Sequence, residues 1–406
     1  MSAARGSGVS PPNGGSAPLA RSAAAPDRSS QTRALDRYLS GSDEEKALGL
    51  FRLLAEDGRP AEGIEPSDLA AVDRELATDL YRGMLMIRTM DDRLMKLQRQ
   101  GRIGFYGEAL GQEAAVIGTA AALSSQDWLV PALREAGAGI YRGLPLHDYV
   151  AQIFGNENDT SRGRQMPCHP GHRATHYVPM SSCVSSQISH AVGIAMAMKL
   201  MGRDDEICIG YLGDGGTSEP DFHVALNFAG VMKAPVVLVC QNNQWAISTP
   251  GTRQTASATI AIKGLGYGIE SLRADGNDVL AVHAVAGYAV DKARQGGGPT
   301  FIELLTYRVG AHSSSDDPSR YRDESITDAW KTDRDPLRRM EAMLDARGWL
   351  GAEQRASLRS DLEARVSRVV TEQESAGPPA LHTLIEDVFE TPSWNLREQL
   401  EHLESQ

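Results

Sequence analysis

The sequence predicts an α/β fold in which a parallel β-sheet carries helices on both faces, with further helices at the two ends of the chain. From residue 180 to residue 305, segments typical of strands and of helices alternate. The strand-like runs at 207–212 and 236–240 are continuously apolar, as expected of parallel strands that are buried on both faces. Together these observations favour a doubly wound α/β domain.

Composition and charge narrow the functional class. The chain carries 41 Lys and Arg against 53 Asp and Glu, and its net charge of −12 excludes nucleic acid as the main partner, because no global positive field attracts a phosphate backbone. No stretch approaches about 18 uninterrupted apolar residues and nothing near Met1 resembles a secretory signal, so we expect neither a membrane span nor export. The four cysteines form no CxxC pair and are expected to be reduced thiols of an intracellular protein.

The first 65 residues predict little folded structure. Residues 1–40 consist mainly of Ser, Ala, Gly, Pro and Arg, so a disordered tail is expected, followed by a partly ordered extension over 41–65. Arginines and few acidic residues in the tail leave a transit peptide as the alternative, although Pro11 and Pro12 would interrupt its amphipathic helix. The expected location is the cytoplasm of a bacterium, or the mitochondrial matrix if residues 1–40 are a transit peptide.

Helices precede the alternating region. Apolar residues between 69 and 97 recur at steps of three and four, which predicts one long amphipathic helix that could break at Gly83. An Ala-rich second helix is expected over 113–123. The polar, histidine-bearing stretch at 156–179 is too long for a simple connector and is expected to carry function.

The alternating region supplies the sheet and its covering helices. Further helices are predicted at 185–200, 221–232 and 278–294, and strands at 207–212, 236–240, 267–272 and 301–305. The domain that contains them, with its N-terminal helices, is expected to span residues 66–324. A charged, helical C-terminal region follows at 325–406 and ends in a helix at 394–403.

The most informative segment follows the strand at 207–212 and opens the next helix. Its sequence, GDGG at 213–216, combines glycines that let backbone N–H groups approach an anion with a helix start that attracts negative charge. A phosphate group is therefore the natural ligand. Asp214 adds a carboxylate and Asn243 follows the next buried strand, so both are expected at the carboxyl edge of the sheet, where open α/β sheets bind ligands.

The same two side chains suit a magnesium ion. Mg²⁺ prefers oxygen ligands and completes its octahedron with phosphate oxygens and water, and the carbonyl of Trp245 could add a third protein oxygen. The alternative interpretation is a structural glycine turn and an Asn-Asn turn without a ligand. Neither GxGxxG nor GxxxxGK[ST] is present, which disfavours a dinucleotide site and a P-loop.

Longer motifs surround this pattern. The GDG start at 213–215 and the NN end at 242–243 are accompanied by GRQMP at 163–167, EPDFHVALNFA at 219–229, QWAIST at 244–249 and TYRVGAHSSSDD at 306–317. Together they resemble the alpha subunits of thiamin diphosphate-dependent 2-oxo acid dehydrogenases, in particular the branched-chain type, over nearly all of the chain from residue 65 to residue 400. Pyruvate and acetoin dehydrogenase alpha subunits share much of this pattern and stand as alternatives.

The resemblance implies a thiamin diphosphate-binding fold and a set of cofactor contacts. Mg²⁺ would be held by Asp214, Asn243 and the carbonyl of Trp245. The diphosphate would bind to Arg134 and to the backbone of the glycine turn, and the cofactor rings would lie against Ser182 and Val184. The full set implied for the cofactor is Arg134, Ser182, Val184, Gly213, Asp214, Gly215, Gly216, Asn243 and His312.

Two histidines are implied in catalysis. His312 matches the active-site histidine of the family, which can steady the phosphate end of the cofactor or pass protons. His169 is expected to face the substrate from its polar loop. Ser313 matches a position that is phosphorylated in mitochondrial relatives, and its alternative is a flexible polar turn. A zinc site formed by Cys168, His169, His172 and His176 is a further alternative. The spacing of these residues, however, fits no closed four-ligand template.

Several positions depart from the family pattern. A potassium-binding loop of branched-chain members is matched by Ser181, Cys183, Ser186 and Gln187. Cys183 and Ser186, however, replace other residues of that loop. Leu133 stands where the family often has Tyr, and Gln241 stands where some members have a diphosphate-binding Arg. Arg134 is therefore expected to balance more of the anion's charge.

The resemblance also implies partners. The chain would form half of an active site in an α₂β₂ heterotetramer, because the beta subunit supplies the glutamate that activates the aminopyrimidine in this family. The assembly would dock on a dihydrolipoyl acyltransferase core, decarboxylate a 2-oxo acid and pass the acyl group to lipoyl groups, in branched-chain amino acid catabolism. A nicotinamide-dependent Rossmann oxidoreductase is the alternative of another class.

Overall fold

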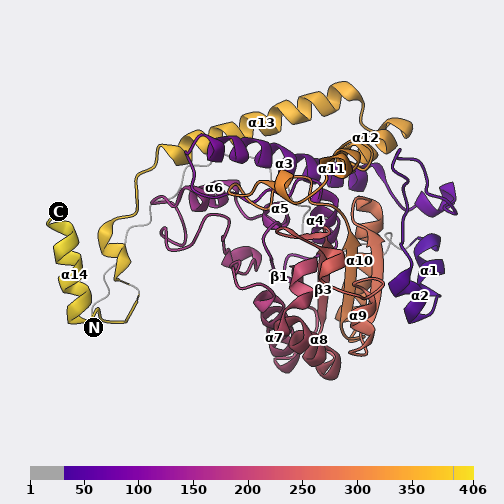
Figure 1. The fold of residues 1–406 in the computed structure, drawn as a ribbon, viewed down its shortest axis with the longest axis horizontal. Helices are drawn as coiled ribbons and strands as arrows, with labels where there is room; N and C mark the ends of the chain where they lie inside the picture. Colours follow the sequence, from indigo (N-terminus) through magenta and orange to yellow (C-terminus); the bar gives the residue numbers. More distant parts are fainter. Residues whose placement is uncertain (1–31, 387) are drawn as a thin grey trace, which may run out of the picture.

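The computed structural model describes residues 32–386 and 388–406. At its centre lies a five-stranded sheet in which neighbouring strands are parallel, in the order β1-β2-β3-β7-β6 (Figure 1). The strands are β1 (Trp128–Val130), β2 (Cys208–Gly213), β3 (Val236–Asn242), β6 (Glu270–Asp275) and β7 (Thr300–Leu305). The predicted α/β fold with a parallel sheet is confirmed.

Helices cover both faces of the sheet. Along β2, Ile209 and Tyr211 belong to one hydrophobic core, whereas Cys208 and Leu212 belong to the other. The first face is covered by α4 (Glu113–Ala120) and α10 (Val279–Arg294), and the second by α7 (Ser186–Leu200) and α8 (Pro220–Met232). Successive residues of a strand point to opposite faces, so burial of both faces requires the continuous apolar runs that the sequence contains.

The long N-terminal helix is unbroken. Asp73 caps α3 (Arg74–Arg99) by accepting a hydrogen bond from the N–H of Leu76 at 2.7 Å. Gly83 lies inside this helix, where a Cβ would be 3.0 Å from Ile117 Cγ2 of α4. The glycine therefore permits a close helix–helix approach and does not interrupt the helix.

Folded structure begins earlier than the sequence predicts. The expected disordered tail runs through residue 40, but Arg33–Leu39 form helix α1. Thr32 Oγ1 caps this helix by accepting from the N–H of Leu35 at 3.1 Å, and Leu35 is buried in the main core, so burial offsets the entropy of ordering the segment. The remainder of the predicted tail, residues 1–31, lies outside the described residues, as does the transit-peptide alternative.

The segment that follows α1 covers the edge strand β6. After α2 (Asp43–Leu48), the N–H of Phe51 donates to the carbonyl of Arg273 at 3.0 Å, and the N–H of Asp275 donates to the carbonyl of Phe51 at 3.0 Å. An uncovered edge would leave a row of unpaired backbone groups. The N-terminal extension thus completes the sheet on this side.

Helices make up the C-terminal region. They are α11 (Glu324–Thr332), α12 (Pro336–Ala346), α13 (Ala352–Glu374) and α14 (Trp394–Glu404). The long helix α13 runs across one side of the molecule along α3, whereas α14 stands apart from the body (Figure 1). None of the helices in the described part of the chain is long and apolar enough to cross a membrane.

Some short elements differ from the sequence prediction or were not part of it. The strand predicted at 267–272 is found three residues later, as β6, because α9 (Ile262–Leu265) and a turn precede it. The sequence also left β1, α5 (Ala136–Tyr141) and α6 (Leu146–Phe154) without a prediction. A small antiparallel hairpin of β4 (Trp245–Ala246) and β5 (Thr249–Pro250) follows β3. Single-turn 3-10 helices lie at Pro66–Leu69, Arg173–Thr175, Asp214–Ser218, Gly251–Arg253, Pro318–Arg320 and Leu381–Leu384.

Candidate active site

The glycine turn and the Asn-Asn turn lie at the same edge of the sheet. Gly213, the last residue of β2, pairs with Gln241 of β3, so Asp214 and Asn243 leave adjacent strands at their carboxyl ends. The turn also packs on the hairpin after β3, because a Cβ on Gly215 would lie 2.5 Å from Ala246 Cβ. The structure therefore brings together the two segments that the sequence paired.

Asp214 is a buried carboxylate, with only 2% of the residue exposed. Its Oδ2 accepts a hydrogen bond from Gln254 Nε2 at 2.9 Å. Burial raises its pKa to about 6, although hydrogen bonds to the carboxylate and the charge of Arg308 act in the opposite direction. A cation beside this carboxylate would offset the cost of burying its charge.

Asn243 is held by two hydrogen bonds. Its Oδ1 accepts from the N–H of Trp245 at 3.2 Å, and its Nδ2 donates to Gln112 Oε1 at 3.0 Å. The amide oxygen thereby points into the turn that carries Trp245, and it retains a second lone pair. Trp245 itself begins the hairpin of β4 and β5.

The glycines of the turn serve packing as well as ligand access. Among the described residues, no atom lies within 4 Å of a Cβ built on Gly213, so space is open beside it. At Gly216 a Cβ would lie 2.7 Å from Ser185 Oγ, which donates to the Gly216 carbonyl at 2.6 Å. Side chains at 215 and 216 would therefore collide with the protein itself, which is a second reason for glycine at these positions.

Arg134 is buried between two segments that are distant in the sequence. Its Nη2 donates to the main-chain carbonyl of His312 at 2.8 Å, and its Nη1 donates to the main-chain carbonyl of Glu108. Burial, followed by the nearby charge of Arg308, lowers its pKa to about 10. The guanidinium is thus a buried cation to which no carboxylate of the described residues is hydrogen-bonded.

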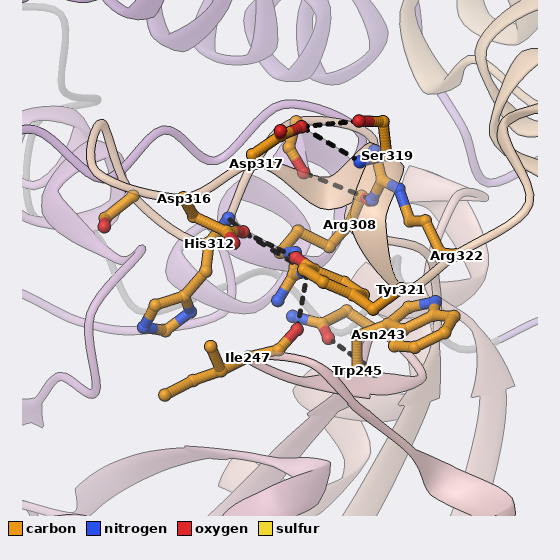
Figure 2. A network of polar contacts seen from close by, with 12 residues as sticks. Asn243, Trp245, Ile247, Arg308, His312, Asp316, Asp317, Ser319, Tyr321 and Arg322 are labelled. Atoms are coloured by element: carbon orange, nitrogen blue, oxygen red, sulfur yellow. Dashed lines mark hydrogen bonds and ion pairs between the residues drawn. The ribbon is translucent and has the colours of Figure 1, made fainter.

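Arg308 is a second buried cation, which the sequence analysis did not assign to the site. It follows β7 and is 1% exposed. Its Nη2 donates to the carbonyl of Ile247 at 2.8 Å and to the hydroxyl of Tyr321 at 2.6 Å (Figure 2). Its Nε and Nη1 are buried without a hydrogen-bond partner in the described structure. An arginine just beyond a buried parallel strand is the sequence signal that could have identified it.

The His312 loop is closed by a polar network. The N–H of His312 donates to Asp316 Oδ2 at 2.7 Å, and the hydroxyl of Tyr321 donates to the same oxygen at 2.5 Å. Figure 2 shows the imidazole of His312 turned away from this network. Burial, together with the charges of Arg134 and Arg308, lowers the pKa of His312 to about 4, so the imidazole is neutral at physiological pH.

His169 contacts Ser182, one of the predicted cofactor contacts. His169 Nε2 lies 2.7 Å from Ser182 Oγ, and its Nδ1 lies 3.0 Å from the carbonyl of Pro167. A carbonyl can only accept, so Nδ1 carries the proton and Nε2 accepts from the serine hydroxyl. Val184, two residues further, is 58% exposed and begins the approach to α7.

The residues of the zinc alternative point to different partners. His172 Nδ1 lies 2.9 Å from Thr175 Oγ1, whereas His176 stacks on Trp128 with ring centroids 4.6 Å apart. Burial raises the pKa of the Cys168 thiol to about 12. Within residues 32–386 and 388–406, no group of three or more His, Cys, Asp and Glu side chains is arranged to hold a metal ion.

The residues of the predicted potassium loop gather at the start of α7. Ser186 Oγ donates to the carbonyl of Cys183 at 2.7 Å and lies 3.2 Å from Ser181 Oγ. Gln187 donates from Nε2 to the carbonyl of Tyr211 at 3.0 Å, whereas its Oε1 is buried without a donor in the described structure. An oxygen acceptor is therefore available at this turn.

Two further positions raised by the sequence are buried. Gln241 donates from Nε2 to Glu135 Oε1, so its amide is hydrogen-bonded to a carboxylate of the protein. Burial raises the pKa of Glu135 to about 7. Ser313 is 7% exposed, so its hydroxyl is covered in this conformation of the loop.

Comparison with known proteins assigns the family. A model described as "Dehydrogenase E1 component" matches residues 81–382, which include both cations, the glycine turn and the His312 loop. The chain belongs to this E1 family. Its members are thiamin diphosphate-dependent enzymes, so the predicted class of oxidoreductase is confirmed, and the nicotinamide-dependent alternative finds no support in the match.

Curated relatives cover most of the chain. The 2-oxoisovalerate dehydrogenase subunit alpha 2, mitochondrial, of Arabidopsis thaliana is 40% identical over 363 residues, which are 89% of this chain and 76% of that protein. The Homo sapiens 2-oxoisovalerate dehydrogenase subunit alpha, mitochondrial, is 39% identical over 356 residues, or 88% of this chain and 79% of the relative. The Dictyostelium discoideum 2-oxoisovalerate dehydrogenase subunit alpha, mitochondrial, is 39% identical over 335 residues, which are 81% of this chain and 76% of that protein.

These relatives confirm the resemblance on which the sequence analysis relied. Branched-chain alpha subunits are the kind of protein that the motifs indicate and that the matches name. The E1 protein described here has relatives named as subunits, which indicates a multi-subunit complex. The names also place these relatives in mitochondria.

Proposed function

We propose that this chain is the alpha subunit of a branched-chain 2-oxo acid dehydrogenase and that it binds thiamin diphosphate with Mg²⁺ at the carboxyl edge of its sheet. The observation that carries the proposal is the placement of two buried cations, Arg134 and Arg308, and one buried carboxylate, Asp214, around that edge. Buried charges are stable when they are paired. A diphosphate bridged by a divalent cation would place negative charge near the arginines and positive charge near Asp214.

The two arginines fit the anion. Burial lowers the pKa of both, the charge of Arg308 lowers that of Arg134 further, and Nε and Nη1 of Arg308 have no acceptor among the described residues. A diphosphate would reverse this penalty. The backbone of Gly213, which faces open space, would bind the same group.

The oxygen set fits magnesium. Asp214, Asn243 and the carbonyl of Trp245 would hold the ion, since one carboxylate, one amide and one carbonyl are hard ligands of the kind that Mg²⁺ accepts beside phosphate. The buried acceptor of Gln187 supports a further proposal, that K⁺ binds at the loop of Ser181, Cys183, Ser186 and Gln187.

Thiamin diphosphate supplies the carbanion chemistry that decarboxylates a 2-oxo acid. The chain's own residues position the cofactor, neutralise the charge of its diphosphate and shield the site from water. His312, neutral because of its burial and the cations around it, can accept or return a proton near the diphosphate end. His169 Nε2 accepts the hydrogen bond of the Ser182 hydroxyl, so that the Ser182 oxygen can offer its lone pairs to the cofactor. Val184 and Ser182 would lie against the cofactor rings.

The partners belong to the same proposal. The chain would assemble with a beta subunit as an α₂β₂ heterotetramer, act on 2-oxo acids and pass acyl groups to the lipoyl groups of a dihydrolipoyl acyltransferase core. Location in a bacterial cytoplasm, or in the mitochondrial matrix if residues 1–40 are a transit peptide, is part of this proposal. Ser313 as a phosphorylation site is part of it as well, and it would require the loop to open, because the hydroxyl is covered.

The test is turnover by the reconstituted assembly. With its beta subunit, thiamin diphosphate and Mg²⁺, the chain should decarboxylate 3-methyl-2-oxobutanoate with a kcat/KM at least about tenfold above that for pyruvate, since added methyl groups in an apolar pocket give discrimination of this order. The chain alone should be inactive. Preference for pyruvate would favour a pyruvate dehydrogenase alpha subunit, and no turnover of either acid would overturn the proposal.

A further inference from the structure

Glu108, which the proposed function does not use, contacts Arg134 through its main chain. Glu108 belongs to the short segment before α4, which is anchored where the N–H of Ala109 donates to Asp91 Oδ2 at 2.7 Å. The main-chain carbonyl of Glu108 accepts from Arg134 Nη1. The same residue thus touches the cation that is proposed to bind the diphosphate.

The side chain of Glu108 packs on the His312 loop. A Cβ built on Gly310 would overlap the carboxylate of Glu108, so position 310 must be glycine while Glu108 keeps this conformation. Gly310 is held from the other side by Arg322, whose Nη1 donates to its carbonyl at 3.2 Å. The carboxylate and the loop therefore have complementary shapes.

The charges around Glu108 are of both signs. Burial raises its pKa, the charges of Arg134 and Arg99 lower it, and the carboxylates of Glu113 and Asp92 raise it. The ionisable groups that face it come from three elements: Asp91, Asp92 and Arg99 on α3, Glu113 on α4, and Arg134 before α5. Of the two cations, Arg134 acts on it more strongly.

We propose that Glu108 is a positioning residue that balances the charge of Arg134 while the cofactor is absent and competes with the diphosphate for this cation, and that its carboxylate seats the His312 loop at Gly310. The inference rests on the proposed binding of the diphosphate at Arg134. Its physical basis is that one guanidinium cannot neutralise two anions at once, so a carboxylate beside it weakens the binding of a second anion.

The competition between the Glu108 charge and the diphosphate is tested by Glu108→Gln in the assembly with the beta subunit. Thiamin diphosphate titrated in the presence of Mg²⁺, followed by calorimetry, should bind about fivefold more tightly to the variant at pH 8. The advantage should shrink towards one as the pH falls, because protonation of Glu108 removes the same charge in the wild type. Glu206→Gln is the matched control, since Glu206 precedes β2 at the opposite edge of the sheet, and it should leave affinity unchanged.

The contact between the Glu108 carboxylate and Gly310 is tested without the cofactor. Gly310→Ala should speed proteolytic cleavage in the 310–320 loop, because the new Cβ displaces the Glu108 carboxylate, whereas in a Glu108→Ala background the same substitution should cause no further increase. Equal affinities of Glu108→Gln and wild type at pH 8, or faster cleavage of the double variant than of Glu108→Ala, would overturn the inference alone. A wild-type assembly that bound no thiamin diphosphate would overturn the proposed function as well.

Discussion

Arg134 donates a hydrogen bond from Nη2 to the main-chain carbonyl of His312 at 2.8 Å, across 178 residues of sequence. The contact joins the cation that is proposed to bind the diphosphate to the loop that carries the candidate catalytic histidine. A diphosphate would act on the same guanidinium. Cofactor binding and the conformation of the His312 loop are therefore expected to depend on each other.

Replacing Arg134 should affect both cofactor binding and the conformation of the His312 loop. In Arg134→Met we expect the affinity for thiamin diphosphate to fall about 30-fold or more, because truncation of one member of a buried charge pair costs about 2 kcal/mol or more. The loop at 310–320 should also be cleaved faster by protease. Arg320→Met is the control, since this side chain lies in the loop but is 84% exposed. Loss of affinity in the control, or an unchanged Kd in Arg134→Met, would contradict the assignment.

Removal of the buried carboxylate should abolish metal-dependent binding. Asp214→Ala is expected to bind thiamin diphosphate no better with Mg²⁺ than without it, because the variant lacks the only charged ligand of the proposed set. Calorimetric titrations with and without Mg²⁺ measure this directly. Asp221→Ala removes an exposed carboxylate seven positions along the same segment and should behave as wild type. An Mg²⁺ effect that survived in Asp214→Ala would rule out its role as a ligand.

Acid should destabilise the chain through His312. Burial and two neighbouring cations lower its pKa from 6.5 to about 4, so between these values the unfolded chain binds a proton that the folded chain excludes. Stability therefore falls as the pH drops from 6.5 towards 4. His312→Gln should lose less stability than wild type over this range. Thermal unfolding midpoints at pH 7.5, 6 and 5 test the sign, and parallel curves for the two proteins would refute it.

The contact between α4 and α10 provides a test of packing. A Cβ at Gly118 would lie 2.6 Å from Val282 Cγ1, so Gly118→Ala should lower the free energy of unfolding by about 1–3 kcal/mol. Gly193→Ala is the matched control, because no atom of residues 32–386 or 388–406 lies within 4 Å of its Cβ position on α7. This control should gain about 0.5–1 kcal/mol from helix propensity. Chemical denaturation of both variants measures the difference, and equal effects would argue against the contact.

Local sequence patterns determined most of the architecture. The long helix at 74–99 follows from apolar residues at helical spacing, and the strands β2 and β3 from continuous apolar runs, because both patterns are set by which faces of an element are buried. The pairing of Asp214 with Asn243 at one sheet edge was also predictable, since parallel strands end at a common edge. The roles of these residues stay predictions.

Burial against distant parts of the chain decided the rest. Helix α1 is ordered because Leu35 enters the main core, which the composition of its own segment does not indicate. Arg308 became part of the candidate site only because folding buries its Nε and Nη1 without an acceptor in the described part of the chain. The sequence by itself indicated the family, the parallel sheet and the long helices, and it predicted site residues whose roles stay predictions. Only the tertiary structure decided which charges are buried close to one another. Their interaction depends on distance and dielectric environment, and neither can be read from the amino-acid sequence.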